Sequence, residues 1–85
     1  MGDTRTLTPS KLGDLVKEVR KASHLRQDQL AGVAGVGIRF IVDLEAGKPT
    51  AQIGKVLGVL AVLGITLTAT PPPNLDLSPT LGSHR

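Results

Sequence analysis

The sequence predicts an all-α fold of four helices, followed by one C-terminal β-strand that pairs across a homodimer. Three observations support this prediction. Apolar residues recur at helical spacing in short segments separated by glycines, residues 51–63 are apolar around a whole helix axis, and residues 65–70 alternate with a period of two. A helix that is apolar on all sides must be covered, and a lone strand must find a partner, so both features favour a second copy of the chain.

The first helix is expected from Pro9 to near Ser23, after a flexible arm at residues 1–8. Proline is favoured at the first helical position, and Thr8 before it is a natural cap for free backbone N–H groups. Four apolar residues follow at the spacing i, i+3, i+4 and i+7, and they should face the core: Leu12, Leu15, Val16 and Val19.

Two shorter helices are expected next, at residues 27–34 and from residue 37 or 38 to residue 46. Asp28 is well placed in the first turn of the earlier one, and Gly35 permits the turn between them. Gly47, followed by lysine and proline, is a strong stop signal. The inward-facing residues of the pair should be Leu30, Ala31, Ala34, Ile41 and Leu44, with Phe40 at the margin.

The fourth helix is expected from Ala51 to Leu63, with Thr50 as its cap. Gly54 and Gly58 each destabilise a helix by about 1 kcal/mol relative to alanine, but they form a smooth strip that lets another backbone approach closely. Seven apolar side chains surround the axis: Ile53, Val56, Leu57, Val59, Leu60, Val62 and Leu63.

Residues 65–70 are the only predicted strand, so its pairing with a second copy predicts a homodimer. One domain at residues 9–70 then binds its ligand and dimerises, and the proline-rich residues 71–85 form a disordered tail. The residues expected at the dimer contact lie on the fourth helix and the strand: Val59, Val62, Leu63, Ile65, Leu67 and Ala69.

Composition excludes several classes of function. The net charge of +3 favours a polyanionic partner, and one aromatic residue cannot form a stacking platform for single strands, so double-stranded DNA remains. With no cysteine and two scattered histidines, we expect no metal and no cofactor. The carboxylates are dispersed, so we expect no enzyme. There is no secretory signal or membrane span, which predicts a protein of the bacterial cytoplasm, associated with the nucleoid and not with a membrane.

Two short helices joined by a glycine-containing turn, between two longer helices, have the organisation of a helix-turn-helix DNA-binding module. The second of the pair enters the major groove, and its outward N-terminal residues should contact bases: Gly37, Ile38, Arg39 and Val42. Arginine can donate two hydrogen bonds to guanine, and apolar side chains can contact thymine methyl groups. In a dimer, two such helices lie roughly 34 Å apart and predict an inverted-repeat operator.

The stretch LRQDQLAGVAGVGIRFIVDLEAGKP resembles the Cro/phage-repressor (XRE) class of helix-turn-helix proteins, and the resemblance covers residues 12–63. The shared pattern has glutamine early in helix two, leucine-alanine within it, and glutamate-x-glycine at the end of helix three. The continuation KPTAQIGKVLGVLAVLGITLTAT is similar to HipB-like antitoxins. The resemblance implies a lambda-repressor-like domain that represses its own operon, neutralises a HipA-like Ser/Thr kinase toxin and pairs its C-terminal strand across the dimer.

The same resemblance implies roles for individual residues. Gln27 and Lys48 would contact DNA phosphates, and Arg20 would form a structural ion pair with Glu45. Arg26 stands where the family usually has a capping serine or threonine, so we expect it to contact phosphate in place of a cap. Serine or threonine is also usual at positions 37 and 42, so specificity here should depend on Arg39 and on DNA shape.

Two other functions remain open from the sequence. One is a stand-alone phage-type repressor, or a regulator of another toxin class, which would bind DNA in the same way. The other is a protein-interaction module without DNA binding, in which the apolar fourth helix or the tail holds the partner.

Overall fold

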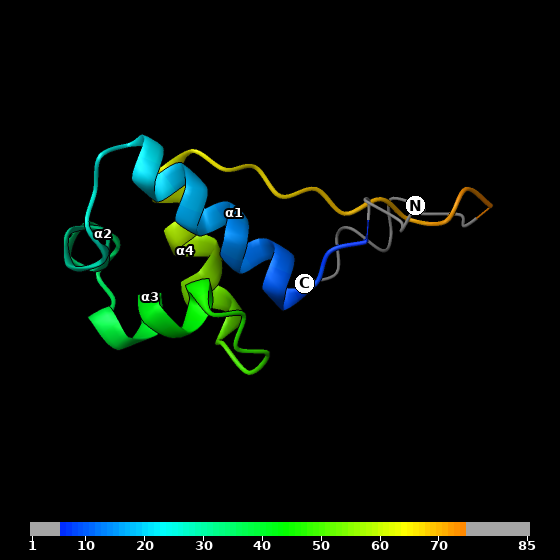
Figure 1. Ribbon diagram of the computed structural model, residues 1–85. Coiled ribbons are helices and arrows are strands. Elements are labelled where there is room, and N and C mark those ends of the chain that lie inside the picture. Colours follow the sequence, from blue (N-terminus) through cyan, green and yellow to red (C-terminus); the bar gives the residue numbers. More distant parts are fainter. Residues whose placement is uncertain (1–5, 75–85) are drawn as a thin grey trace.

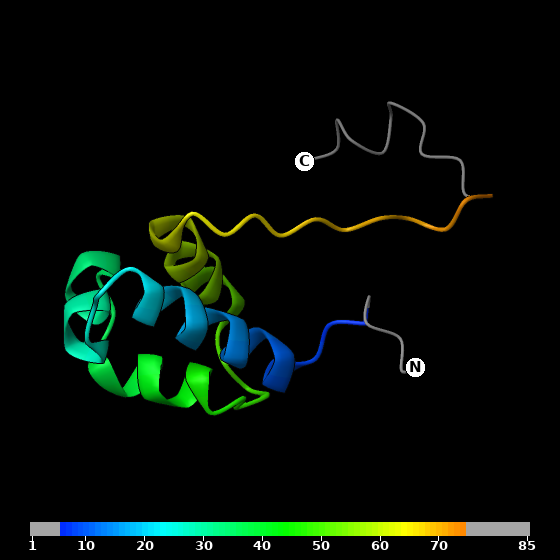
Figure 2. The same cartoon turned by 45° about the horizontal axis from the view of Figure 1, so that its top comes forward.

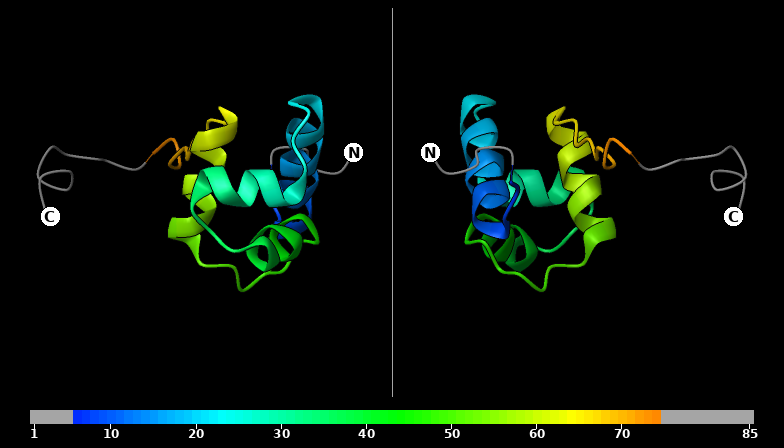
Figure 3. Two further views of the ribbon diagram at one scale, coloured as in Figure 1. Left: turned by 90° about the vertical axis from the view of Figure 1, so that its left-hand side faces the viewer. Right: turned by 90° about the vertical axis from the view of Figure 1, so that its right-hand side faces the viewer.

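The computed structural model describes residues 6–74, which form four α-helices and an extended C-terminal segment (Figure 1). The helices are α1 (Pro9–Ala22), α2 (Gln27–Ala34), α3 (Ile38–Glu45) and α4 (Ile53–Leu63). Figure 3 shows α1 and α4 on opposite sides of the body, with α2 crossing between them and α3 closing the lower end. The predicted all-α fold is therefore confirmed.

The core lies where the four helices meet. α3 packs against both α1 and α2, and α4 packs against α2 and α1. α3 is thus held from two sides, while its opposite side faces outward. Every helix contributes to the buried apolar cluster: Val16, Leu30, Ala31, Ile41, Leu44, Val56, Val59 and Leu60.

Local signals position the ends of the first three helices as predicted. Thr8 Oγ1 accepts a hydrogen bond of 3.1 Å from the Lys11 N–H, so Thr8 caps α1. α2 ends at Gly35, whose φ of 71° lies in the left-handed region, and Gly47, with a φ of 83°, follows the end of α3. These bounds agree with the sequence prediction to within one residue because each signal acts on neighbouring backbone groups.

The buried face of α1 is different from the predicted one. Its buried residues are Gly13, Val16 and Arg20, whereas Leu15 is 40% exposed. Gly13 lies directly against the backbone carbonyl oxygens of Leu44 and Glu45, where a Cβ atom would overlap them. This close approach rotates α1 about its axis, so the prediction that Leu15 faces the core was wrong.

Helix α4 begins later than predicted, and Thr50 is not its cap. Thr50 lies in a turn after Pro49, and Gln52 takes the cap position with extended backbone (φ −68°, ψ 121°) and no side-chain cap bond. The first bond of the helix runs from the Val56 N–H to the Gln52 carbonyl, at 3.1 Å. The turn that follows α3 uses the residues that the sequence assigned to the start of α4.

Half of α4 is uncovered in the single chain, as its all-round apolar character predicted. Ile53 is 70% exposed, Leu57 46% and Val62 39%. Val59, by contrast, has no exposed surface. It belongs to the core of its own chain, so its assignment to a dimer contact was wrong.

Residues 65–74 run out from the end of α4 as an extended segment (Figures 1 and 2). Ile65 is half-buried and its N–H bonds the Leu60 carbonyl at 2.9 Å, but residues 66–74 are exposed. Within residues 6–74 no strand is formed, because the described chain offers this segment no second edge. Of the predicted arm and tail, residues 1–5 and 75–85 lie outside the described residues.

No helix among the described residues has both the length and the apolar content needed to cross a bilayer. These residues also bring together no group of three or more metal-ligating side chains.

Candidate nucleic-acid interface

The turn between α2 and α3 is closed by two backbone hydrogen bonds. The Val36 N–H bonds the Ala31 carbonyl at 3.0 Å, and the Gly35 N–H bonds the Gly32 carbonyl at 3.4 Å. This pair of bonds is a Schellman motif, which needs a left-handed residue at Gly35. Val36 then packs on the core, so the turn fixes the direction in which α3 leaves α2.

The N-terminus of α3 presents its side chains to solvent. Arg39 has 84% of its side chain exposed, Ile38 is 50% exposed and Val42 is half-buried beside them. Gly37 caps the helix with φ −74°, and a Cβ atom added there would meet nothing within 4 Å. The fold does not require glycine at this position. Because glycine has no side chain, the backbone at the start of α3 is left uncovered there. Gly37, Ile38 and Arg39 therefore lie at the N-terminal end of α3, and Val42 lies one turn further along the helix.

The opposite end of α3 is anchored by a buried ion pair. Arg20 Nε donates to Glu45 Oε2 at 2.6 Å and Arg20 Nη2 donates to Glu45 Oε1 at 3.0 Å, so the implied contact between α1 and α3 is present. The hydrogen bond to Glu45 raises the pKa of Arg20 above its ordinary value, against the opposing effect of burial. Arg20 Nη1 also donates to the Leu25 carbonyl at 2.8 Å. One guanidinium thus joins α1, the loop before α2, and α3.

Gln27, the first residue of α2, belongs to this buried cluster. Its Nε2 donates to Glu45 Oε1 at 3.1 Å, and the residue is half-buried. In the free protein its side-chain amide therefore joins α2 to the end of α3. The phosphate contact implied for Gln27 stays a prediction.

Arg26 stands at the cap position of α2 without capping it. Instead the Arg26 backbone N–H donates a hydrogen bond of 2.8 Å to Gln29 Oε1. A glutamine in the first turn of α2 therefore satisfies this backbone donor at the start of the helix, where the family usually has a capping serine or threonine. The Arg26 guanidinium extends over Asp28, with 3.1 Å between Nε and Oδ1, and this hydrogen bond lowers the pKa of Asp28. Arg26 is exposed at the N-terminal end of α2, and the phosphate contact expected for it stays a prediction.

Asp43 was missed as a site residue at the sequence level. Its carboxylate lies between two predicted DNA contacts, with Oδ1 3.4 Å from Arg39 Nε and Oδ2 3.5 Å from Lys48 Nζ. The Lys48 N–H also bonds the Asp43 carbonyl at 3.0 Å, which fixes Lys48 just past α3. The spacing of four residues from Arg39 to Asp43 was visible in the sequence, but the approach of Lys48 depends on the turn after α3.

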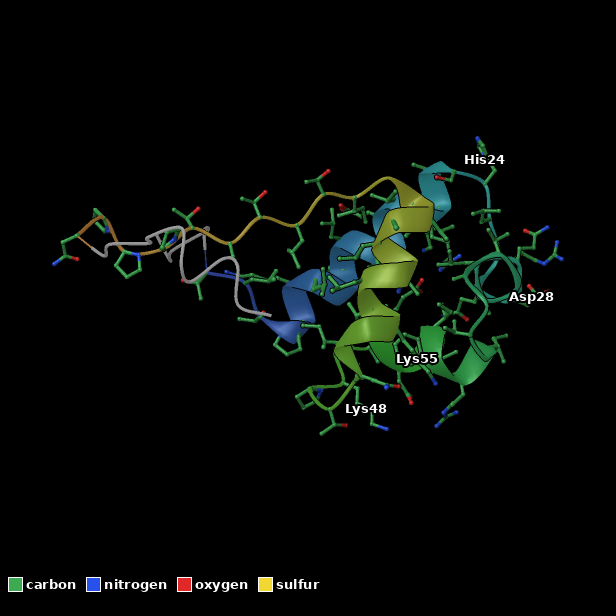
Figure 4. The ribbon with its side chains drawn as sticks, turned by 180° about the vertical axis from the view of Figure 1, so that it is seen from behind. His24, Asp28, Lys48 and Lys55 are labelled. Atoms are coloured by element: carbon green, nitrogen blue, oxygen red, sulfur yellow. The ribbon has the colours of Figure 1, made fainter. Side chains whose placement is uncertain are left out.

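A further cation, Lys55 of α4, was also missed. Its Nζ lies 6.0 Å from the centroid of the Phe40 ring, at the edge of cation–π range. Lys48 and Lys55 border the same small hollow of about 140 Å³, and Figure 4 shows both on the side of the molecule that carries α3. His24 lies at the far end of the molecule in the same view. Basic side chains thus continue from Arg39 and Lys48 onto the start of α4.

Comparison with known sequences shows that the chain belongs to a helix-turn-helix family. Residues 16–69 match the helix-turn-helix family model HTH_3. The uncharacterized HTH-type transcriptional regulator y4mF of Sinorhizobium fredii (strain NBRC 101917 / NGR234) is 66% identical over 68 residues, which are 80% of this chain and 90% of that protein. The ImmF control region 10 kDa protein of Bacillus phage phi105 is 35% identical over 57 residues, 67% of this chain and 62% of that protein.

Solved structures share the fold. HipB in a complex described as HipB-O4 20mer superimposes with a TM-score of 0.71 and 20% sequence identity, covering 81% of this chain and 97% of that one. HipB in a HipA-HipB-O2-O3 complex gives the same values. A protein described as MDT protein gives a TM-score of 0.69 with 21% identity over 81% of this chain and 97% of that one. At these identities the likeness concerns the arrangement of the helices.

Proposed function

Since this chain belongs to the XRE-type helix-turn-helix family, we propose that it is a sequence-specific repressor that binds double-stranded DNA as a homodimer. One observation carries the proposal: α3 presents Ile38 and Arg39 outward in its first turn, with the half-buried Val42 one turn further on, while a buried ion pair anchors its far end. A rigidly held helix with exposed base-reading groups at its N-terminus is what major-groove recognition requires.

The dimer of this proposal uses the uncovered surfaces of the single chain. Leu57 and Val62 on α4, together with Leu67 in the extended segment, are large apolar side chains at least 39% exposed. Pairing residues 65–70 with their copy would give backbone partners to residues 66–70, which form no strand within residues 6–74. A two-fold axis then relates two α3 helices and selects an inverted repeat.

The proposed biological role is that of an antitoxin that neutralises a HipA-like Ser/Thr kinase toxin and represses its own operon. Its support is the resemblance of residues 48–70 to HipB-like antitoxins and the likeness of the fold to HipB, which has been solved in a complex with HipA. The proposal assigns the chain no catalytic group, since its task is to bind DNA and a second protein.

A second candidate is a stand-alone regulator without a toxin. It is favoured by the sequence relatives, because one is described as an HTH-type transcriptional regulator and the other as a phage control-region protein. Both candidates predict the same contacts between α3 and DNA and differ only in the protein partner.

The test is a pull-down of the full chain from its native host, with bound DNA and bound protein identified in the same sample. Recovery of its own promoter together with a kinase-like protein is the expected result. Recovery of promoter DNA without a protein partner would instead support the stand-alone regulator. A protein partner without any DNA would overturn the repressor proposal and favour a protein-interaction module.

A further inference from the structure

We propose that Asp43 is a specificity-determining residue, which weakens binding to random DNA and holds Arg39 ready for its base contact. The inference rests on the proposed DNA-binding function and deepens it. It follows from the position of one carboxylate between two cations on the outward side of α3, a relationship that neither the family resemblance nor the related proteins assign.

The geometry leaves the useful donors of Arg39 free. Asp43 Oδ1 lies 3.4 Å from Arg39 Nε, the inner nitrogen of the guanidinium. Because this contact is made at Nε, the outer edge formed by the two terminal amino groups can still donate in parallel to O6 and N7 of a guanine. Asp43 thus restrains the guanidinium from behind without occupying its bidentate edge.

Lys48 is held differently. Its Nζ lies 3.5 Å from Asp43 Oδ2, and an ammonium has only this one charged centre with which to bind a phosphate. Both cations are exposed, with 84% of the Arg39 side chain and 53% of the Lys48 side chain reaching solvent, whereas Asp43 is half-buried with 26% of its side chain exposed. A phosphate can therefore reach Lys48 from solvent, but it must approach against the negative charge of Asp43.

The charges on α3 are not in the arrangement that best stabilises a helix. Arg39 lies in its first turn and Asp43 in its last, whereas the helix dipole favours an acid at the N-terminus and a base at the C-terminus. The Arg39 to Asp43 pair also runs in the less favourable of the two i, i+4 orientations. A pair arranged against both preferences is better explained by what it does at the DNA surface.

Asp43 therefore affects the affinity for random DNA and the affinity for the operator differently. Random DNA is bound through phosphates, so a carboxylate beside Arg39 and Lys48 weakens the attraction of these two cations for the DNA backbone. At the operator, Arg39 bonds a base edge while its Nε stays beside Asp43, and the restraint lowers the entropy lost on binding. Asp43 consequently raises the ratio of specific to non-specific affinity.

The experiment compares Asp43→Asn with the wild-type full chain on a short random-sequence duplex and on the promoter duplex upstream of its own gene, over a range of salt concentrations. The asparagine keeps the size of the side chain and removes its charge. We expect affinity for the random duplex to rise about fivefold at low salt, with a salt dependence steeper by about one phosphate contact. Affinity for the promoter duplex should rise less or fall.

The matched control is Glu18→Gln, which removes the same charge from the exposed side of α1. A second check adds Lys48→Gln to each background: the lysine should contribute more to random-duplex binding when Asp43 is absent, which a purely structural role would not produce.

Equal effects of Asp43→Asn and Glu18→Gln, or additive effects of the Asp43 and Lys48 changes, would overturn the inference and leave DNA binding intact. Failure of the wild-type chain to bind either duplex would instead overturn the proposed function. The two failures are therefore distinguishable.

Discussion

Glu45, the last residue of α3, accepts two hydrogen bonds from the guanidinium of Arg20 in α1, at 2.6 and 3.0 Å, with both side chains at least nine-tenths buried. The same Glu45 carboxylate accepts a third bond from Gln27 of α2. The end of α3 is therefore tied to both helices on which it packs. Because the proposed base-reading residues lie toward the other end of α3, this cluster fixes the orientation in which the helix would present them to DNA.

Arg20→Ala should lower the free energy of unfolding by about 3 kcal/mol, because it leaves the Glu45 carboxylate buried without its charged partner. Urea unfolding followed by circular dichroism, at one fixed protein concentration, measures the change. Lys17→Ala on the exposed side of α1 is the control and should change the value by less than about 0.5 kcal/mol. A loss for Arg20→Ala no larger than that of the control would show that the ion pair does not hold α3.

Gly13→Ala should destabilise the protein by about 1 to 3 kcal/mol, although alanine normally favours a helix. The added methyl group would overlap the carbonyl oxygens of Leu44 and Glu45 and push α1 away from α3. The control is Gly32→Ala in α2, where a Cβ atom meets nothing within 4 Å, and this change should stabilise the protein slightly. Thermal unfolding of both variants checks the opposite signs, and a stabilising Gly13→Ala would contradict the close packing of the two helices.

Arg39→Ala should weaken operator binding by about 1 to 3 kcal/mol while changing random-duplex binding much less, because its contact with a base is lost. Lys48→Ala should weaken both kinds of binding and reduce the salt dependence by about one phosphate contact. Titrations of labelled duplexes at several salt concentrations measure both effects. Lys21→Ala in the last turn of α1 controls for the loss of one positive charge. If Arg39→Ala weakens both duplexes equally, Arg39 does not read bases.

Leu67→Pro should convert the proposed dimer to monomers that bind DNA poorly, because proline removes a backbone donor from the shared strand. Leu67→Ala keeps the backbone donor and should weaken the dimer less. Sedimentation measures the association state of each variant. A dimer that survives Leu67→Pro but dissociates on Leu57→Asp would place the interface on α4 instead of on the extended segment.

The helices were predictable because their ends depend on neighbouring residues. Thr8 with Pro9 starts α1, Gly35 ends α2 and Gly47 follows α3, and each acts on backbone groups within one turn. The outward position of Arg39 followed from the same short-range logic, since it lies one residue inside a short amphipathic helix. Helix type, order and approximate ends, and the exposed N-terminus of α3, were therefore determined by the sequence alone.

The tertiary structure decided which faces meet. Periodicity placed Leu15 in the core, but the approach of Gly13 to the carbonyl oxygens of α3 turned α1 so that Leu15 is exposed and Arg20 is buried. The position of the Asp43 carboxylate between Arg39 and Lys48 likewise depends on how the chain turns after α3. Such contacts depend on the distance and rotation between helices, which are set when all four helices pack together. No local sequence pattern predicts them.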